Sequence, residues 1–166
     1  LRDAPAERCP LGNPGQRLDL GDRRLLALRP PVYDAPETMA VFDEATGFLF
    51  SSDCFGALLP EPCEHVRELA APQLEAGMQR WATIDAPWLH TFDADEMARG
   101  LQAIERLAPK AVLSTHLPVA TDVLPMLLAT LASAGTVEPF VGPDQAALMA
   151  VLQGAPAGQA PEAVAA

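Results

Sequence analysis

The sequence predicts an α/β fold in which helices cover a sheet, and two features of its pattern lead to this prediction. Short strand-like apolar runs fill the first third of the chain, whereas apolar residues spaced three and four apart dominate beyond Gly56. Two of the apolar runs end on chemically active side chains: one precedes Asp53 and the other precedes His116. Strands that come first and helices that come later are typical of layered folds, so we expect half of a sandwich.

Two hairpins are expected in the strand-rich part. The first pairs 17–20 with 23–28 around a Gly21-Asp22 turn, and a Pro pair stops its second strand. The second pairs 38–42 with 47–51 through a polar four-residue turn. A further strand is expected at 111–115, directly before His116.

The spacing of apolar residues predicts helices in the rest of the chain. A first helix is expected to be interrupted or bent near Pro72, the second to begin at the cap Asp93, and the third to include Pro125 only within its first turn. The expected helices span 64–82, 93–107, 121–134 and 144–152.

Composition divides the chain into three parts. Residues 1–15 are rich in Pro and Gly and are expected to form an irregular lead-in, 16–153 to form one structured unit, and 154–166, rich in Ala, Pro and Gly, to form a disordered tail. Because residue 1 is Leu rather than Met, a segment is expected to be missing upstream.

Charge and composition exclude several classes of partner. The chain carries 11 basic and 22 acidic residues, a net charge of -11, which would repel nucleic acid and anionic lipid. No apolar stretch is long enough to span a bilayer and no signal-peptide pattern is present, so a cytoplasmic protein without nucleic-acid or membrane partners is expected. Its three cysteines include no Cys-x-x-Cys pair, so we expect reduced thiols.

Three segments carry a resemblance to a known family. The run from Phe48 through Asp53 to Gly56, together with 33–39 and 114–116, resembles the metallo-β-lactamase fold, and is most similar to the oxygen-binding di-iron lactamase domain of flavodiiron proteins. The resemblance implies an αββα sandwich and a site for two divalent metal ions, zinc or iron. It places Asp53 as the carboxylate that bridges the two metals and His116 as a terminal imidazole ligand.

Two departures from the family pattern bear on this site. Asp34 stands where the family usually has His, which makes it a candidate ligand supported by position but not by residue type. The His-x-His-x-Asp or His-x-Glu-x-Asp run of the family is absent, and His65 and His90 cannot replace it, because neither has a second ligand two or four residues further on. The chain therefore resembles the C-terminal half of the domain, with an exposed sheet edge prone to association, for example as a homodimer.

Each of these residues also has a structural interpretation. Without the resemblance, Asp53 would be interpreted as a helix cap or turn residue and His116 as a structural histidine. His90 is expected to serve in packing or to line a pocket. Cys54 is expected to be a buried thiol, because no base or cation is evident near it. Four further side chains could line a substrate pocket or serve only in packing: Tyr33, Glu37, Trp81 and Trp88.

Three functional hypotheses follow from the resemblance. The first is a binuclear metal-dependent hydrolase acting on a small-molecule substrate. The second is a di-iron protein that binds O₂ or NO and receives electrons from a flavin protein. The third is a non-catalytic module, either an oxygen sensor or a degenerate relative of the fold. The metal content of the complete protein separates the three hypotheses.

Overall fold

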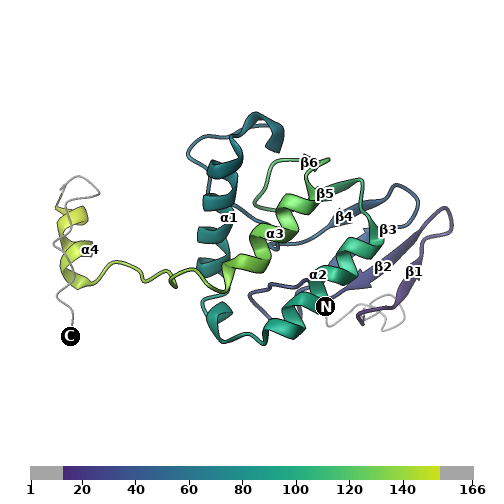
Figure 1. Ribbon diagram of the computed structural model, residues 1–166, viewed down its shortest axis with the longest axis horizontal. Coiled ribbons are helices and arrows are strands. Elements are labelled where there is room, and N and C mark those ends of the chain that lie inside the picture. The colour runs from purple at the N-terminus through teal and green to yellow at the C-terminus, as the bar shows by residue number, and fades with distance from the viewer. Residues whose placement is uncertain (1–12, 154–166) are drawn as a thin grey trace, which may run out of the picture.

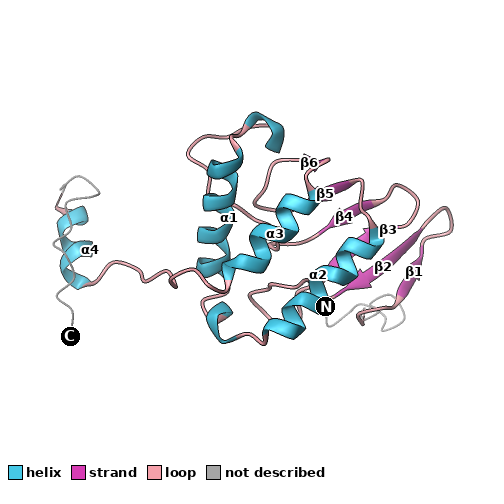
Figure 2. Ribbon diagram, in the orientation of Figure 1, coloured by secondary structure: helices cyan, strands magenta, loops and turns pink. Residues whose placement is uncertain are grey.

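The computed structural model describes residues 13–153, and in them a mixed sheet carries helices on one of its faces (Figures 1 and 2). The sheet contains six strands, which neighbour one another in the order of the sequence. Their bounds are β1 Arg17–Asp19, β2 Arg24–Leu28, β3 Ala40–Asp43, β4 Phe48–Phe50, β5 Ala111–Leu113 and β6 Ala120–Thr121.

The two predicted hairpins are confirmed. In the first, β1 pairs antiparallel with β2, with Leu18 opposite Leu25 and the turn passing through Gly21 at φ +91°. In the second, β3 pairs antiparallel with β4, with Phe42 opposite Leu49. The positive φ at Gly21 explains why a glycine stands at that turn, because side chains with a Cβ rarely adopt this conformation.

The strand before His116 is also confirmed, and it lies parallel to β4. Phe48, Leu49 and Phe50 pair in register with Ala111, Val112 and Leu113. The long connection from β4 to β5 contains two α-helices and two short 3₁₀ turns, as expected for strands that pair in parallel. A sixth strand, β6, pairs antiparallel with β5 and was not predicted, since a two-residue strand has no periodicity to detect.

The helices mostly match the expected segments. Two are short 3₁₀ turns, which carry the labels η2 and η3 and were not predicted. The bounds are η2 Val66–Glu68, α1 Ala71–Asp85, η3 Leu89–Thr91, α2 Ala94–Leu107, α3 Leu124–Ala134 and α4 Gln145–Leu152.

The expected helical segment 64–82 is interrupted near Pro72 rather than bent, and its main helix extends beyond Ala82. The helix α1 begins at Ala71, with Pro72 in its first turn, and η2 stands apart before it. Proline lacks an amide hydrogen and disfavours helical backbone at the residue before it, so it starts a helix more readily than it bends one. The cap of α2 is confirmed, because the Asp93 side chain accepts hydrogen bonds from the amides of Asp95 and Glu96.

The core lies between the sheet and the helices. In Figure 1, α2 and α3 cross one face of the sheet, with α1 beside α3. Leu49 at the centre of this face is fully buried, and Val112 from β5 and Leu127 from α3 join the same core. Side chains of a strand alternate between faces, so Phe48 and Phe50 point to the opposite face, where they are 37% and 46% exposed.

The remaining parts of the chain contribute little to this core. The helix α4 has no buried residue and lies apart from the sheet in Figure 1. No helix within residues 13–153 is long and apolar enough to cross a membrane. The expected disordered tail at 154–166 and residues 1–12 of the expected lead-in lie outside the described residues.

Ala108 offers a test of the backbone after α2. It adopts the left-handed conformation (φ 47°, ψ 55°) that ends the helix, a position that glycine occupies at lower cost because it lacks a Cβ. We expect Ala108→Gly to raise the free energy of unfolding by about 1 kcal/mol, measured by chemical denaturation. A decrease in stability would contradict the left-handed assignment.

Candidate metal centre at two strand ends

The parallel pairing of β4 and β5 brings together the strand ends that carry Asp53 and His116. Backbone hydrogen bonds continue the pairing beyond the strands, from Ser51 N to Leu113 O at 3.0 Å and from Thr115 N to Ser52 O at 3.0 Å. A third bond joins Ala57 N to His116 O at 2.9 Å. The carboxyl ends of parallel strands are where α/β sheets commonly bind ligands.

Asp53 and His116 meet at this edge. His116 Nε2 lies 3.0 Å from Asp53 Oδ1, and the same oxygen accepts a hydrogen bond from Thr115 Oγ1 at 2.6 Å. The carboxylate is 25% exposed and the imidazole 45% exposed, so both can be reached from solvent. The two side chains are therefore in direct contact, and an imidazole nitrogen and a carboxylate oxygen are both donor types that divalent metal ions bind.

The loop that carries Asp53 has an unusual backbone. Ser52 (φ 56°) and Phe55 (φ 67°) both adopt positive φ, which costs roughly 1–2 kcal/mol for a residue with a Cβ. Such conformations persist only where surrounding contacts hold them, and they are frequent at functional sites. Gly56 N and the indole Nε1 of Trp81 both donate to Asp53 O, at 3.0 and 3.1 Å.

Trp81 therefore belongs to this site. From the sequence alone, this residue could either line a pocket or serve only in packing. Its ring also stacks on His116, with 4.1 Å between the ring centroids and 34° between the planes. The other three aromatic or acidic candidates lie elsewhere: Tyr33 packs edge to face on Phe92, and Trp88 and Glu37 are exposed.

Asp34 is not brought into contact with the pair. Its carboxylate is exposed and accepts a hydrogen bond from Thr38 Oγ1 at 2.8 Å. Among residues 13–153, no group of three His, Cys, Asp or Glu side chains is close enough to hold a metal ion. Asp53 and His116 form a two-ligand arrangement, and the assignment of Asp34 as a ligand stays a prediction.

Asp85, which the sequence analysis missed, lies in the same electrostatic environment. Burial at the last residue of α1, together with the negative charges of Asp53 and Asp34, raises its carboxyl pKa to about 6. Asp85 stands four residues after Trp81, which places both on one face of the helix. The available signal in the sequence was this i, i+4 spacing near a helix end.

The raised pKa of Asp85 has a consequence for stability in the metal-free chain. Its pKa is about 6 in the folded state against 3.8 in the unfolded state, so stability falls as the pH rises from about 4 through about 6. Asp85→Asn is expected to raise the thermal midpoint above that of the wild type at pH 7.5 but not below pH 4. Glu75→Gln, on the exposed side of α1, is the control for removing one negative charge from the same helix. An equal effect of Asp85→Asn at both pH values would contradict the assignment.

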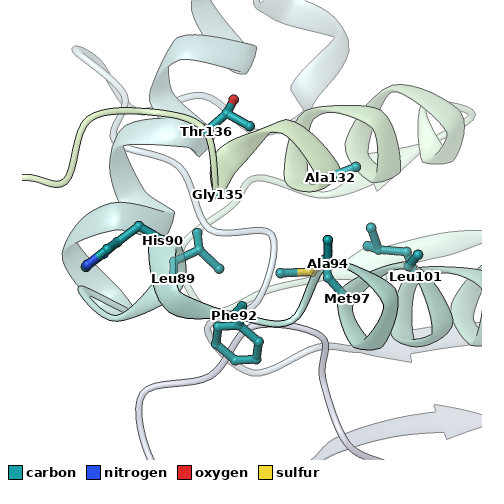
Figure 3. A pocket seen from close by; sticks show the side chains of 10 residues that line it. Leu89, His90, Phe92, Ala94, Met97, Leu101, Ala132, Gly135 and Thr136 are labelled. Atoms are coloured by element: carbon teal, nitrogen blue, oxygen red, sulfur yellow. The ribbon is translucent and has the colours of Figure 1, made fainter.

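The other histidines have structural roles. His65 caps η2 and lies 2.8 Å from Thr121 Oγ1 through its Nε2. His90 is exposed, with its Nδ1 3.0 Å from Pro87 O, at the rim of a mostly apolar cavity of about 190 Å³ between η3, α2 and the end of α3 (Figure 3). The residues that line this cavity do not include Asp53 or His116.

Cys54 follows Asp53 in the sequence but faces the core. It is fully buried, and this burial raises the pKa of its thiol to about 12. The thiolate is therefore scarce at neutral pH, which agrees with the prediction of a buried, unreactive thiol.

Comparisons with known proteins support the fold through structure alone. No protein-family model matches the sequence, and a search of curated proteins finds no match. The structure is similar to the flavodiiron protein from Giardia intestinalis, with a TM-score of 0.62 and 18% identity over 75% of this chain and 30% of that chain. Rubredoxin oxygen:oxidoreductase from Desulfovibrio gigas gives a TM-score of 0.61 and 17% identity over 76% of this chain and 31% of that chain.

A shorter protein also matches. The chemotaxis sensor ODP, solved as a peroxy di-iron species, gives a TM-score of 0.55 and 17% identity over 82% of this chain and 56% of that chain. The predicted metallo-β-lactamase-like α/β fold is therefore confirmed, as a partial domain. The chain spans about 30% of the length of the flavodiiron structures that it matches.

Proposed function

We propose that this chain contributes Asp53 and His116 to a binuclear metal centre, and that the centre holds iron and binds O₂ or NO. The observation that carries the proposal is the 3.0 Å approach of His116 Nε2 to Asp53 Oδ1 at the ends of two parallel strands. Similarity in fold to a flavodiiron protein, to rubredoxin oxygen:oxidoreductase and to a sensor solved as a peroxy di-iron species supports iron. The hydrolase hypothesis stays a prediction, since no observation specifically favours zinc.

Asp53 and His116 supply part of the ligand set that a metal ion needs. Asp53 would supply an oxygen to both ions, and His116 would supply its Nε2 to one of them. Bound iron would supply redox chemistry on a diatomic ligand. Thr115 Oγ1, which donates to Asp53 Oδ1, orients the carboxylate, and hydrogen-bonded partners of this kind commonly tune the affinity of metal ligands.

Further ligands are needed to complete the site, because within residues 13–153 no group of three His, Cys, Asp or Glu side chains is close enough to hold a metal ion. The open face of the sheet offers a place for that part of the site, because Phe48, Phe50 and Leu18 are exposed there at 37%, 46% and 45%. A second sheet packed on this face would complete a sandwich and bury these side chains. If the complete protein is a reductase, a flavin protein would supply its electrons. If it is a sensor, it would bind the diatomic ligand without catalytic turnover.

Metal analysis of the complete polypeptide that contains this sequence tests the proposal. We expect two irons per chain and a change in visible absorption when O₂ or NO is added to the reduced protein. Two zinc ions together with hydrolysis of an ester, thioester or phosphoester would overturn the di-iron proposal in favour of a hydrolase. A protein that binds no metal would overturn both.

The 166-residue chain allows a direct test of the ligands. Its three histidines, His65, His90 and His116, give separate imidazole signals in NMR spectra. Addition of Zn²⁺ as a probe is expected to shift the His116 signals, while those of His65 and His90 act as internal controls. Shifts confined to His65 or His90 would contradict the placement of the site.

A further inference from the structure

Trp81 contacts both residues of the proposed metal centre through different parts of its ring. Its indole Nε1 donates to the backbone carbonyl of Asp53 at 3.1 Å, and its face stacks on His116 with 4.1 Å between centroids. These two contacts join α1 to both strand ends at once. Trp81 is half-buried and stands outside the hydrophobic core, so its position is not explained by core packing.

The loop after Asp53 is shaped to admit the indole. A Cβ added at Gly56 would lie 2.4 Å from Trp81 Nε1 and 2.9 Å from Asp53 O, closer than atoms can approach. Gly56 is therefore required for the approach of the indole rather than for a positive φ. The hydrogen bond from Trp81 also helps to hold a loop whose residues Ser52 and Phe55 adopt costly positive φ values.

We propose that Trp81 is a positioning residue, which fixes the plane of the His116 imidazole and the loop of Asp53 so that Nε2 and Oδ1 face one metal position. This inference rests on the proposed function. An indole has a single N–H donor and no lone pair to offer a metal, so Trp81 acts through Asp53 and His116 and not as a ligand. Residues that orient metal ligands in this way typically change metal affinity by 10–100-fold.

The first experiment uses the metal-free 166-residue chain and does not depend on the proposed function. NMR spectra are expected to show contacts between the indole protons of Trp81 and the His116 ring, and a ring-current displacement of the His116 signals. Trp81→Leu removes both contacts and should abolish the displacement, whereas Trp81→Phe keeps a ring without the N–H donor. Trp88→Phe, at the chain's other tryptophan, which is 41% exposed, is the matched control and should leave the His116 signals unchanged.

The second experiment measures Zn²⁺ affinity from the His116 signals. We expect affinity to fall by about 10-fold or more in Trp81→Leu, by less in Trp81→Phe, and not at all in Trp88→Phe. Trp81→Phe is the more conservative variant and keeps the test usable if Trp81→Leu does not fold. Unchanged affinity in a folded Trp81 variant would overturn the inference.

The experiments distinguish failure of the proposed metal centre from failure of the positioning role of Trp81. If metal analysis of the complete polypeptide finds no bound metal while the His116 signals of the metal-free chain respond to Trp81→Leu, the proposed metal centre fails and the positioning of His116 by Trp81 stands. If the His116 signals in the metal-free chain are unchanged in every Trp81 variant, the positioning role is overturned, whether or not the protein binds metal.

Discussion

Replacing Asp53 with Ala is expected to abolish the Zn²⁺-induced shift of the His116 signals, with a loss in affinity of about 100-fold or more. Asp53 Oδ1 and His116 Nε2 converge at 3.0 Å, so removing the carboxylate leaves a single imidazole at the site. One neutral ligand holds a divalent ion far less tightly than an imidazole together with a carboxylate. The measurement is an NMR titration of the 166-residue chain.

The fold should survive this substitution. The hydrogen bonds from Gly56 N and Trp81 Nε1 end on the backbone carbonyl of Asp53, which Ala retains. Asp34→Ala tests the remaining candidate ligand, whose carboxylate accepts a hydrogen bond from Thr38 Oγ1. An unchanged affinity in Asp34→Ala would also remove Asp34 from the candidate ligands. Retained Zn²⁺ binding in Asp53→Ala would contradict the site assignment.

The second large effect is expected from Leu49→Ala in the centre of the sheet. Leu49 is fully buried against the helices, and deleting its side-chain atoms leaves a cavity among close-packed neighbours such as Val112 and Leu127. The expected loss in the free energy of unfolding is about 3 kcal/mol, measured by chemical denaturation.

The next residue of β4 provides the comparison. Phe50 is larger than Leu49 but points to the open face, where it is 46% exposed, so Phe50→Ala should cost less than about 1 kcal/mol in the monomeric chain. A larger loss for Phe50→Ala than for Leu49→Ala would show that the open face is covered in solution. In that case the loss should grow with protein concentration if a second copy covers it.

Local pattern was sufficient to predict much of the secondary structure. The hairpins follow from alternating apolar residues around Gly21 and a polar turn, and α2 follows from Asp93 and its evenly spaced apolar face. The interruption of the segment 64–82 follows from Pro72, which stands in the first turn of α1, but the pattern did not show the separate turn η2 before it. The strand β6 was not predicted because it has two residues, too few to show the alternation of apolar and polar side chains that marks a strand.

The sequence alone also determined which side chains could form the site, since Asp53 and His116 each follow an apolar strand and match the pattern of one family. Only the tertiary structure decided that these two meet and that α1 brings Trp81 and Asp85 to the same edge. The physical reason is that strand and helix propensities act over neighbouring residues. Contact between distant residues depends instead on the register of β4 against β5 and on the packing of α1.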